Sequence, residues 1–149
     1  MMRRKKFSQG KFDPKNPEKY IGTYPIKYRS SWELVFMNVC DNNSNIKQWA
    51  SESIKIPYRH PFTGRSTVYI PDFLIHYQDK NGKSKVEVIE IKPIRQTLAE
   101  KARGTKAKMV VAINKAKWTS AQSWCKKHGM VFRIMTEENM FAQSGGMKK

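Results

Sequence analysis

The sequence predicts a single α/β (α+β) domain in which helices flank a mixed β-sheet. The 149 residues are 39% hydrophobic and 11% aromatic, a composition that supports one folded core of modest size. Runs rich in Val, Ile, Phe and Tyr alternate with runs of helical periodicity, in the order helix, three strands, helix, strand. This order predicts a layered domain built on a mixed sheet.

Residues 1–25 are predicted to form a basic, extended arm before a domain of residues 26–141, with residues 142–149 as a flexible tail. Four basic residues stand in a row at positions 3–6, and the arm's prolines interrupt any periodicity. Two interpretations fit this arm. It is either a solvated tail or a segment that becomes ordered when it grips DNA or a protein partner.

The first helix is predicted to begin at Ser30 or Ser31, with Ser31 as its cap. Apolar residues then recur at helical spacing: Trp32, Val35, Phe36, Val39 and Cys40. The polar run at residues 41–45 ends this helix. Weak alternation predicts a strand over residues 48–56, followed by a loop over residues 57–65.

A β-hairpin is the clearest element of the sequence. Its strands are predicted over residues 68–77 and 85–91, both rich in β-branched and aromatic residues. The connection over residues 78–84 contains Asn81-Gly82, a pair typical of tight turns. An odd loop centred on Asn81 pairs residues whose numbers add up to about 162, and a two-residue turn shifts this sum by one.

The C-terminal third is predicted to be helical and then extended. A basic helical stretch begins near Thr97 and is interrupted at Gly104. A helix over residues 106–128, broken near Thr119, ends at Gly129. A last strand over residues 130–135 precedes a short helix that starts at Thr136.

The charge of the chain points to a polyanionic partner. Its 29 basic and 12 acidic residues give a formal net charge of +17, and nucleic acid is the usual partner of such a protein. No membrane association is expected, because no apolar run of about 18 residues and no basic amphipathic anchor is present. Cys40 and Cys125 lack the spacing of a zinc site, and we expect both to be free thiols.

Two carboxylates and a lysine are predicted to meet at the end of the hairpin. Glu90 and Lys92 are two residues apart and share one face of a strand, while Asp72 lies opposite Glu90 or diagonal to it. Two adjacent carboxylates repel each other, and a divalent cation relieves that repulsion. Their hard oxygen atoms suit Mg²⁺ or Mn²⁺, which would activate a water for phosphodiester hydrolysis with help from Lys92.

Glu33, one turn into the first helix, is a candidate to complete this metal site. A purely structural interpretation fits the same residues. Asp72 would then be a hydrogen-bond acceptor at a strand end, and Glu90 and Lys92 a surface salt bridge worth less than about 1 kcal/mol.

Further residues are candidates for accessory or DNA-contacting roles. His60 and Gln96 are possible accessory residues of the site, although His60 fits an exposed loop position better. Basic residues near the site or in the arm could contact phosphates without reading sequence. These are Arg3, Arg4, Lys5, Lys6, Arg59, Arg95, Lys101, Arg103 and Lys106.

Three runs carry a resemblance to a known superfamily. Ser31-Trp32-Glu33, Tyr69-Ile70-Pro71-Asp72-Phe73-Leu74 and Val88-Ile89-Glu90-Ile91-Lys92-Pro93 resemble the PD-(D/E)xK nucleases, and within them the TnsA-like endonuclease domain. The size, basic N-terminus and motif spacing are also similar to the head-completion nucleases of T-even-type tailed phages. The resemblance extends over about residues 20–139 and implies a restriction-endonuclease-like core.

The resemblance implies a Mg²⁺-dependent DNA nuclease with little sequence specificity, acting in phage head completion and head–tail joining. Glu33, Asp72, Glu90 and the Ile91 carbonyl would bind the metal, and Lys92 would be the catalytic lysine. Double-stranded DNA and phage head, portal or neck proteins would be its partners, in the host cytoplasm during assembly or at the head–neck region of the virion. Two alternatives remain: a non-enzymatic DNA-binding protein of the virion neck, and a structure-specific resolvase or transposon-end endonuclease.

Overall fold

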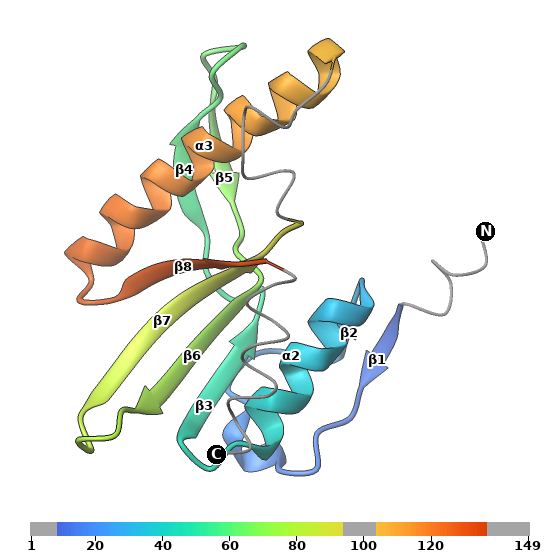
Figure 1. Ribbon diagram of the computed structural model, residues 1–149, viewed down its shortest axis with the longest axis vertical. Helices are drawn as coiled ribbons and strands as arrows, with labels where there is room; N and C mark the ends of the chain where they lie inside the picture. The colour runs from blue at the N-terminus through green and yellow to red at the C-terminus, as the bar shows by residue number, and fades with distance from the viewer. Residues whose placement is uncertain (1–8, 94–103, 137–149) are drawn as a thin grey trace.

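A computed structural model of the protein describes residues 9–93 and 104–136 (Figure 1). Two α-helices, α2 (Ser31–Asn42) and α3 (Gly104–Lys127), and a 3-10 turn, η1 (Pro17–Lys19), lie in this part of the chain. The strands are β1 (Gly10–Phe12), β2 (Ile26–Tyr28), β3 (Ile46–Ser51), β4 (Ile56–Arg59), β5 (Ser66–Tyr69), β6 (Phe73–Gln78), β7 (Ser84–Ile91) and β8 (Val131–Met135).

The central sheet is mixed, as the sequence predicts. Its strand order is β3-β6-β7-β8, with β7 and β8 parallel and the other neighbours antiparallel. In the β6–β7 hairpin Phe73 pairs with Ile89 and Gln78 pairs with Ser84, so the paired numbers add up to 162. The structure therefore confirms the first of the two predicted registers, that of an odd loop centred on Asn81, and not the register of a two-residue turn. The Asp79 carboxylate accepts the backbone N–H groups of Asn81 and Lys83, which fixes the turn.

Two predicted strands are in fact interrupted. The strand predicted over residues 48–56 is divided between β3 and β4, and the one predicted over residues 68–77 is divided between β5 and β6. Pro71 has no N–H to donate at the second break, and Glu52 has a positive φ of 50° at the first. The Glu52 N–H donates to the Asp72 carbonyl (2.9 Å), so the two breaks lie side by side.

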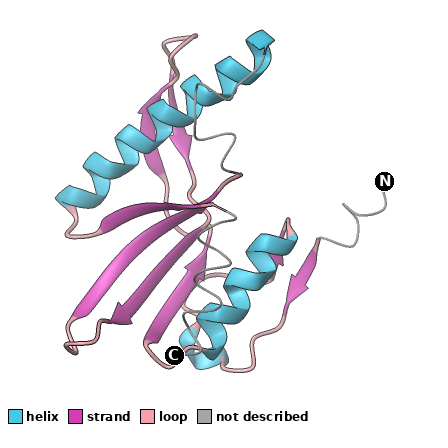
Figure 2. Ribbon diagram, in the orientation of Figure 1, coloured by secondary structure: helices cyan, strands magenta, loops and turns pink. Residues whose placement is uncertain are grey.

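The loop predicted over residues 57–65 is also shorter than expected. Residues 57–59 belong to β4, which pairs antiparallel with β5 to form a separate hairpin. This hairpin projects from the central sheet beneath α3 (Figure 2).

Two hydrophobic clusters hold the layers together. On one face of the sheet, Phe36 and Met37 of α2 pack with Phe73, Ile89 and other residues of β3, β6, β7 and β8. On the other face, Trp118 and Ala121 of α3 pack with Ile56 and Tyr69 of the β4–β5 hairpin, against which Phe132 and Ile134 of β8 also lie. The sheet is therefore covered on both faces, as expected of the predicted fold class.

The predicted boundary after residue 25 lies within folded structure. β1 pairs with β2, and Phe12 and Tyr20 are buried in the same cluster as Trp49. The buried Asp41 carboxylate accepts the N–H groups of Lys15 (2.8 Å) and Asn16 (3.0 Å), which anchors this segment to the end of α2. Residues 9–25 are thus part of the folded domain, while residues 1–8 and the tail at 142–149 lie outside the described chain.

Helix boundaries differ slightly from those predicted. Ser30, rather than Ser31, caps α2, because the Ser30 side chain accepts the Glu33 N–H. α3 runs without a break past Thr119, and Gly129 ends it with a φ of 71°. The helical stretch predicted from Thr97 lies largely outside the described residues, as does the helix predicted from Thr136.

Cys40 and Cys125 are buried free thiols, as predicted. Neither α2 nor α3 has the combination of length and hydropathy that a membrane-crossing helix would need.

Candidate active site

The predicted carboxylates come together where β6 and β7 end. Asp72 directly precedes the first residue of β6, and Glu90 follows Ile89, the last residue of β7 that is paired with β6. The Asp72 carboxylate accepts the Ile91 N–H at 2.8 Å, which ties it to the end of β7. Glu90 is only 5% exposed, an unusual burial for a glutamate. We call Asp72 and Glu90 the carboxylate pair.

The carboxylate pair is electrostatically strained. Burial, followed by the nearby charge of Glu90, raises the pKa of Asp72 to about 8. Burial also raises the pKa of Glu90, although the Tyr69 hydroxyl and the Lys92 ammonium partly offset this effect. In the protein without a bound cation, keeping both carboxylates ionised therefore costs free energy. A positive charge placed between them would lower that cost.

Lys92 lies beside the carboxylate pair. Its Nζ is 3.6 Å from Glu90 Oε2, and its side chain is 29% exposed. The Lys92 backbone N–H donates to the Met135 carbonyl (3.0 Å), so β8 fixes the residue that follows β7. The ammonium group is thus held at the edge of the site, where solvent or a substrate can reach it.

Glu33 lies near this site but its carboxylate is engaged elsewhere. Its Oε1 accepts the Arg29 N–H at 3.0 Å, within the cap of α2. Burial raises the pKa of Glu33, and the charge of Glu33 contributes to the raised pKa of Asp72. Over residues 9–93 and 104–136, no three Asp, Glu, His or Cys side chains are grouped closely enough to hold a metal ion. The structure therefore brings Asp72, Glu90 and Lys92 together, with Glu33 adjacent but not converging on them.

Two side chains at the site were missed from sequence. The Tyr69 hydroxyl donates to Glu90 Oε1 at 2.7 Å in a buried hydrogen bond. Lys117 of α3 lies with its Nζ 5.6 Å from the centre of the Tyr69 ring, and burial and the charge of Lys92 lower its pKa. The sequence could have indicated Tyr69, because it directly precedes the Ile70-Pro71-Asp72 run. No sequence signal marks Lys117, because only the packing of α3 over the β4–β5 hairpin brings it close to the carboxylate pair.

Other predicted residues lie apart from the carboxylate pair. His60 is at the turn of the β4–β5 hairpin, where its Nδ1 accepts the N–H groups of Phe62 and Thr63. Arg59, beside it, donates to the Gly64 carbonyl (2.7 Å), and Lys106 is exposed in the first turns of α3. The remaining candidates lie outside the described residues: Arg3, Arg4, Lys5, Lys6, Arg95, Gln96, Lys101 and Arg103.

The donor atoms present fit a hard divalent cation. The carboxylate pair offers oxygen ligands, which Mg²⁺ and Mn²⁺ prefer, and the raised pKa values report the negative charge that a cation would neutralise. Mg²⁺ usually keeps several water ligands, so two protein carboxylates can be sufficient to bind it.

Comparison with known proteins agrees with this geometry. The family described as "TnsA-like endonuclease N terminal" matches residues 43–137, a span that contains the carboxylate pair, Lys92 and Lys117. Over 142 residues the chain is 37% identical to the head completion nuclease of Enterobacteria phage T4, and the match covers 89% of this chain and 93% of that protein. Together with the mixed sheet and its flanking helices, these matches confirm the family expected from the sequence motifs. The chain belongs to the TnsA-like endonuclease family.

Proposed function

We propose that this protein is a divalent-metal-dependent DNA nuclease that cuts phosphodiester bonds with little sequence specificity during phage head completion. The observation that carries the proposal is the buried carboxylate pair with Lys92 beside it, at the end of the β6–β7 hairpin. The net charge of +17 suits a DNA substrate. The name of the T4 relative supports the stage at which the protein would act.

Asp72 and Glu90 would hold the metal ion, which we expect to be Mg²⁺ or Mn²⁺. Such an ion, when bound, lowers the pKa of a water ligand and offsets negative charge on the phosphoryl oxygens. Glu33 and the Ile91 carbonyl are the further ligands expected from the superfamily. Since the Glu33 carboxylate accepts the Arg29 N–H, its recruitment would require a side-chain rotation or a bridging water.

The chain's own residues would perform the remaining tasks. Lys92 places a positive charge at the rim of the site, where it can stabilise charge that develops on the phosphate and help to orient the attacking water. Tyr69 donates to Glu90 and fixes the orientation of its carboxylate. Lys117 adds a second ammonium group on the α3 side of the site.

The proposed setting follows from the relative's role. We infer that double-stranded DNA is the substrate and that head, portal or neck proteins of a phage are the protein partners. The protein would act in the host cytoplasm during assembly or at the head–neck region of the virion. Contacts to the DNA backbone carry no sequence information, so a nuclease that relies on them would cut with little preference.

A plasmid assay tests the proposal. Supercoiled DNA should be converted to nicked and linear forms by the wild type with Mg²⁺ or Mn²⁺, and should remain intact in EDTA. Lys92→Ala should lose this activity, whereas Lys80→Ala, an exposed lysine in the turn at the opposite end of β6 and β7, should keep it. Cleavage that persists in EDTA, or equal cleavage by Lys92→Ala, would contradict the proposed mechanism.

A further inference from the structure

Two lysines face each other across the β1–β2 ladder. Lys11 is the direct partner of Lys27, and both side chains are exposed. Their neighbours Phe12 and Ile26, also paired, are buried on the opposite face. Like charges directly opposite each other destabilise an antiparallel pair. No ion pair to an acidic side chain within residues 9–93 and 104–136 relieves this repulsion.

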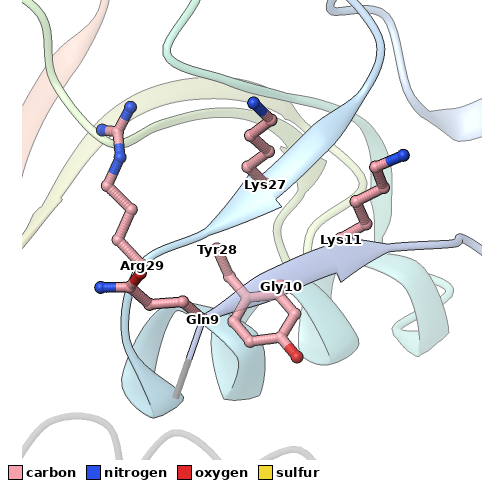
Figure 3. Close-up of a pocket in the computed structure, with 6 residues that line it drawn as sticks. All are labelled: Gln9, Gly10, Lys11, Lys27, Tyr28 and Arg29. Atoms are coloured by element: carbon pink, nitrogen blue, oxygen red, sulfur yellow. The ribbon is translucent and has the colours of Figure 1, made fainter. Parts of the chain in front are cut away.

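These lysines border an open pocket of about 460 Å³ at the edge of the domain. Its lining consists of Gln9, Gly10, Lys11, Lys27, Tyr28 and Arg29, and contains no carboxylate (Figure 3). Figure 3 shows Lys11, Lys27 and Arg29 extending from the same side of the two strands. Tyr28 packs closely over Gly10, where an added Cβ would come within 2.7 Å of the tyrosine oxygen. Because Arg29 is paired with Glu52, the positive charge that the pocket presents to a ligand comes from Lys11 and Lys27.

A chain of contacts joins this β1–β2 pocket to the candidate active site. The Arg29 N–H donates to Glu33 Oε1 at 3.0 Å, and the Arg29 guanidinium pairs with the Glu52 carboxylate. The Glu52 N–H donates in turn to the Asp72 carbonyl at 2.9 Å. Arg29, which follows β2, is thus linked through Glu52 to the segment that carries Asp72.

We propose that the β1–β2 pocket is a subsite for the phosphodiester backbone of the DNA that is cut, with a phosphate held between Lys11 and Lys27. This inference rests on the proposed function and specifies the path of its substrate. A phosphate group relieves the repulsion between the two ammonium groups, and no residue that lines the pocket is a carboxylate that would oppose it. Since such contacts read no bases, the subsite contributes affinity and position rather than sequence preference.

The double variant Lys11→Gln/Lys27→Gln tests the subsite. The probe is a fluorescently labelled DNA duplex in EDTA, with binding followed by anisotropy over a range of KCl concentrations. We expect affinity about tenfold weaker at moderate salt, and a log–log salt slope shallower by about 1, as for the loss of one phosphate contact. In cleavage assays with Mg²⁺ the KM should rise by a similar factor, while kcat at saturating DNA stays unchanged.

The matched control is Lys80→Gln/Lys83→Gln, which removes two exposed lysines from the β6–β7 turn at the other end of the sheet. This control also lowers the formal charge from +17 to +15, so it accounts for any general effect of charge. It should bind DNA with nearly wild-type affinity and salt slope. The melting temperature of Lys11→Gln/Lys27→Gln should equal or exceed that of the wild type, because the substitution relieves repulsion.

The outcomes separate this inference from the proposed function. If the wild type cleaves DNA but the two double variants bind it equally well, the subsite is refuted and the nuclease assignment stands. If the wild type never cleaves DNA yet Lys11→Gln/Lys27→Gln alone has a shallower salt slope, the subsite is supported and the nuclease assignment fails. A lower melting temperature together with weaker binding would mean that the lysines serve the fold, which overturns the inference.

Discussion

Asp72→Asn should stabilise the metal-free protein while it abolishes cleavage. The pKa of Asp72 is raised from 3.8 to about 8, chiefly by burial and then by the charge of Glu90. One pKa unit corresponds to about 1.4 kcal/mol, so a fully ionised Asp72 costs at most about 5–6 kcal/mol of folding free energy. Because the repulsion is shared with Glu90 and side chains relax, we expect about half of this, on the order of 2–3 kcal/mol.

The sign of the effect fixes its pH dependence. A carboxyl whose pKa is raised on folding binds its proton more tightly in the folded state, so its contribution to stability falls as pH rises from about 4 to about 8. An asparagine does not titrate, and its side-chain oxygen can still accept the Ile91 N–H. The advantage of Asp72→Asn should therefore be near zero around pH 4, grow up to pH 8 and remain constant above it.

Urea unfolding in EDTA, followed by tryptophan fluorescence, measures this difference at pH 5, 7 and 8.5. For a chain of this length a gain of 2–3 kcal/mol corresponds to roughly 5–10 °C in melting temperature. Adding Mg²⁺ should raise the melting temperature of the wild type more than that of Asp72→Asn, since only the former keeps both carboxylates. A variant that is less stable at pH 8.5, or equally stabilised at pH 5 and pH 8.5, would refute the reasoning.

Three other substitutions test neighbouring parts of the structure. Tyr69→Phe removes the hydrogen bond to Glu90. In steady-state kinetics kcat should fall about tenfold or more at unchanged DNA affinity, and the free energy of unfolding should fall by about 1–2 kcal/mol. An unchanged kcat would contradict this. Lys117→Gln should slow single-turnover cleavage, because it removes a positive charge near Glu90 and Lys92. Lys117→Arg keeps that charge and should restore part of the rate. Equal rates for the two variants would argue against a role for the charge. Asp41→Ala leaves the N–H groups of Lys15 and Asn16 without their acceptor. Urea unfolding should show a loss of about 2–3 kcal/mol in the free energy of unfolding, while cleavage by the folded protein stays near the wild-type rate. An unchanged unfolding midpoint would mean that residues 9–25 are not anchored at Asp41.

Local chemistry predicted much of this fold from the sequence. The β6–β7 hairpin and its register follow from alternation and from the Asn81-Gly82 turn, which act over a few residues. The break at Glu52 was missed because its partner, the Asp72 carbonyl, is distant in sequence, whereas Pro71 was a local signal for the break before β6. The integration of residues 9–25 was missed for a similar reason: its few apolar residues become a core only where Trp49 meets them.

The same distinction applies to the candidate site. Asp72, Glu90 and Lys92 were found together because one hairpin carries all three, and its register fixes their proximity. Lys117 comes from a helix that reaches the site only after α3 has packed on the β4–β5 hairpin, so no local pattern marks it. Residues supplied by long-range packing are the ones that sequence reasoning loses.

Glu33 shows how helix formation and metal binding can compete for one carboxylate. At the third position of α2 its side chain accepts the Arg29 N–H, while its own N–H donates to the capping Ser30. A cap of this kind contributes about 1 kcal/mol, and neutralising the buried charge of the carboxylate pair is worth more than that. A bound cation could therefore draw Glu33 away from the cap, so the start of α2 would report on the loaded site. The Arg29 N–H, which donates to Glu33, should then exchange with solvent faster when Mg²⁺ binds than in EDTA. Unchanged exchange would mean that Glu33 stays with the helix.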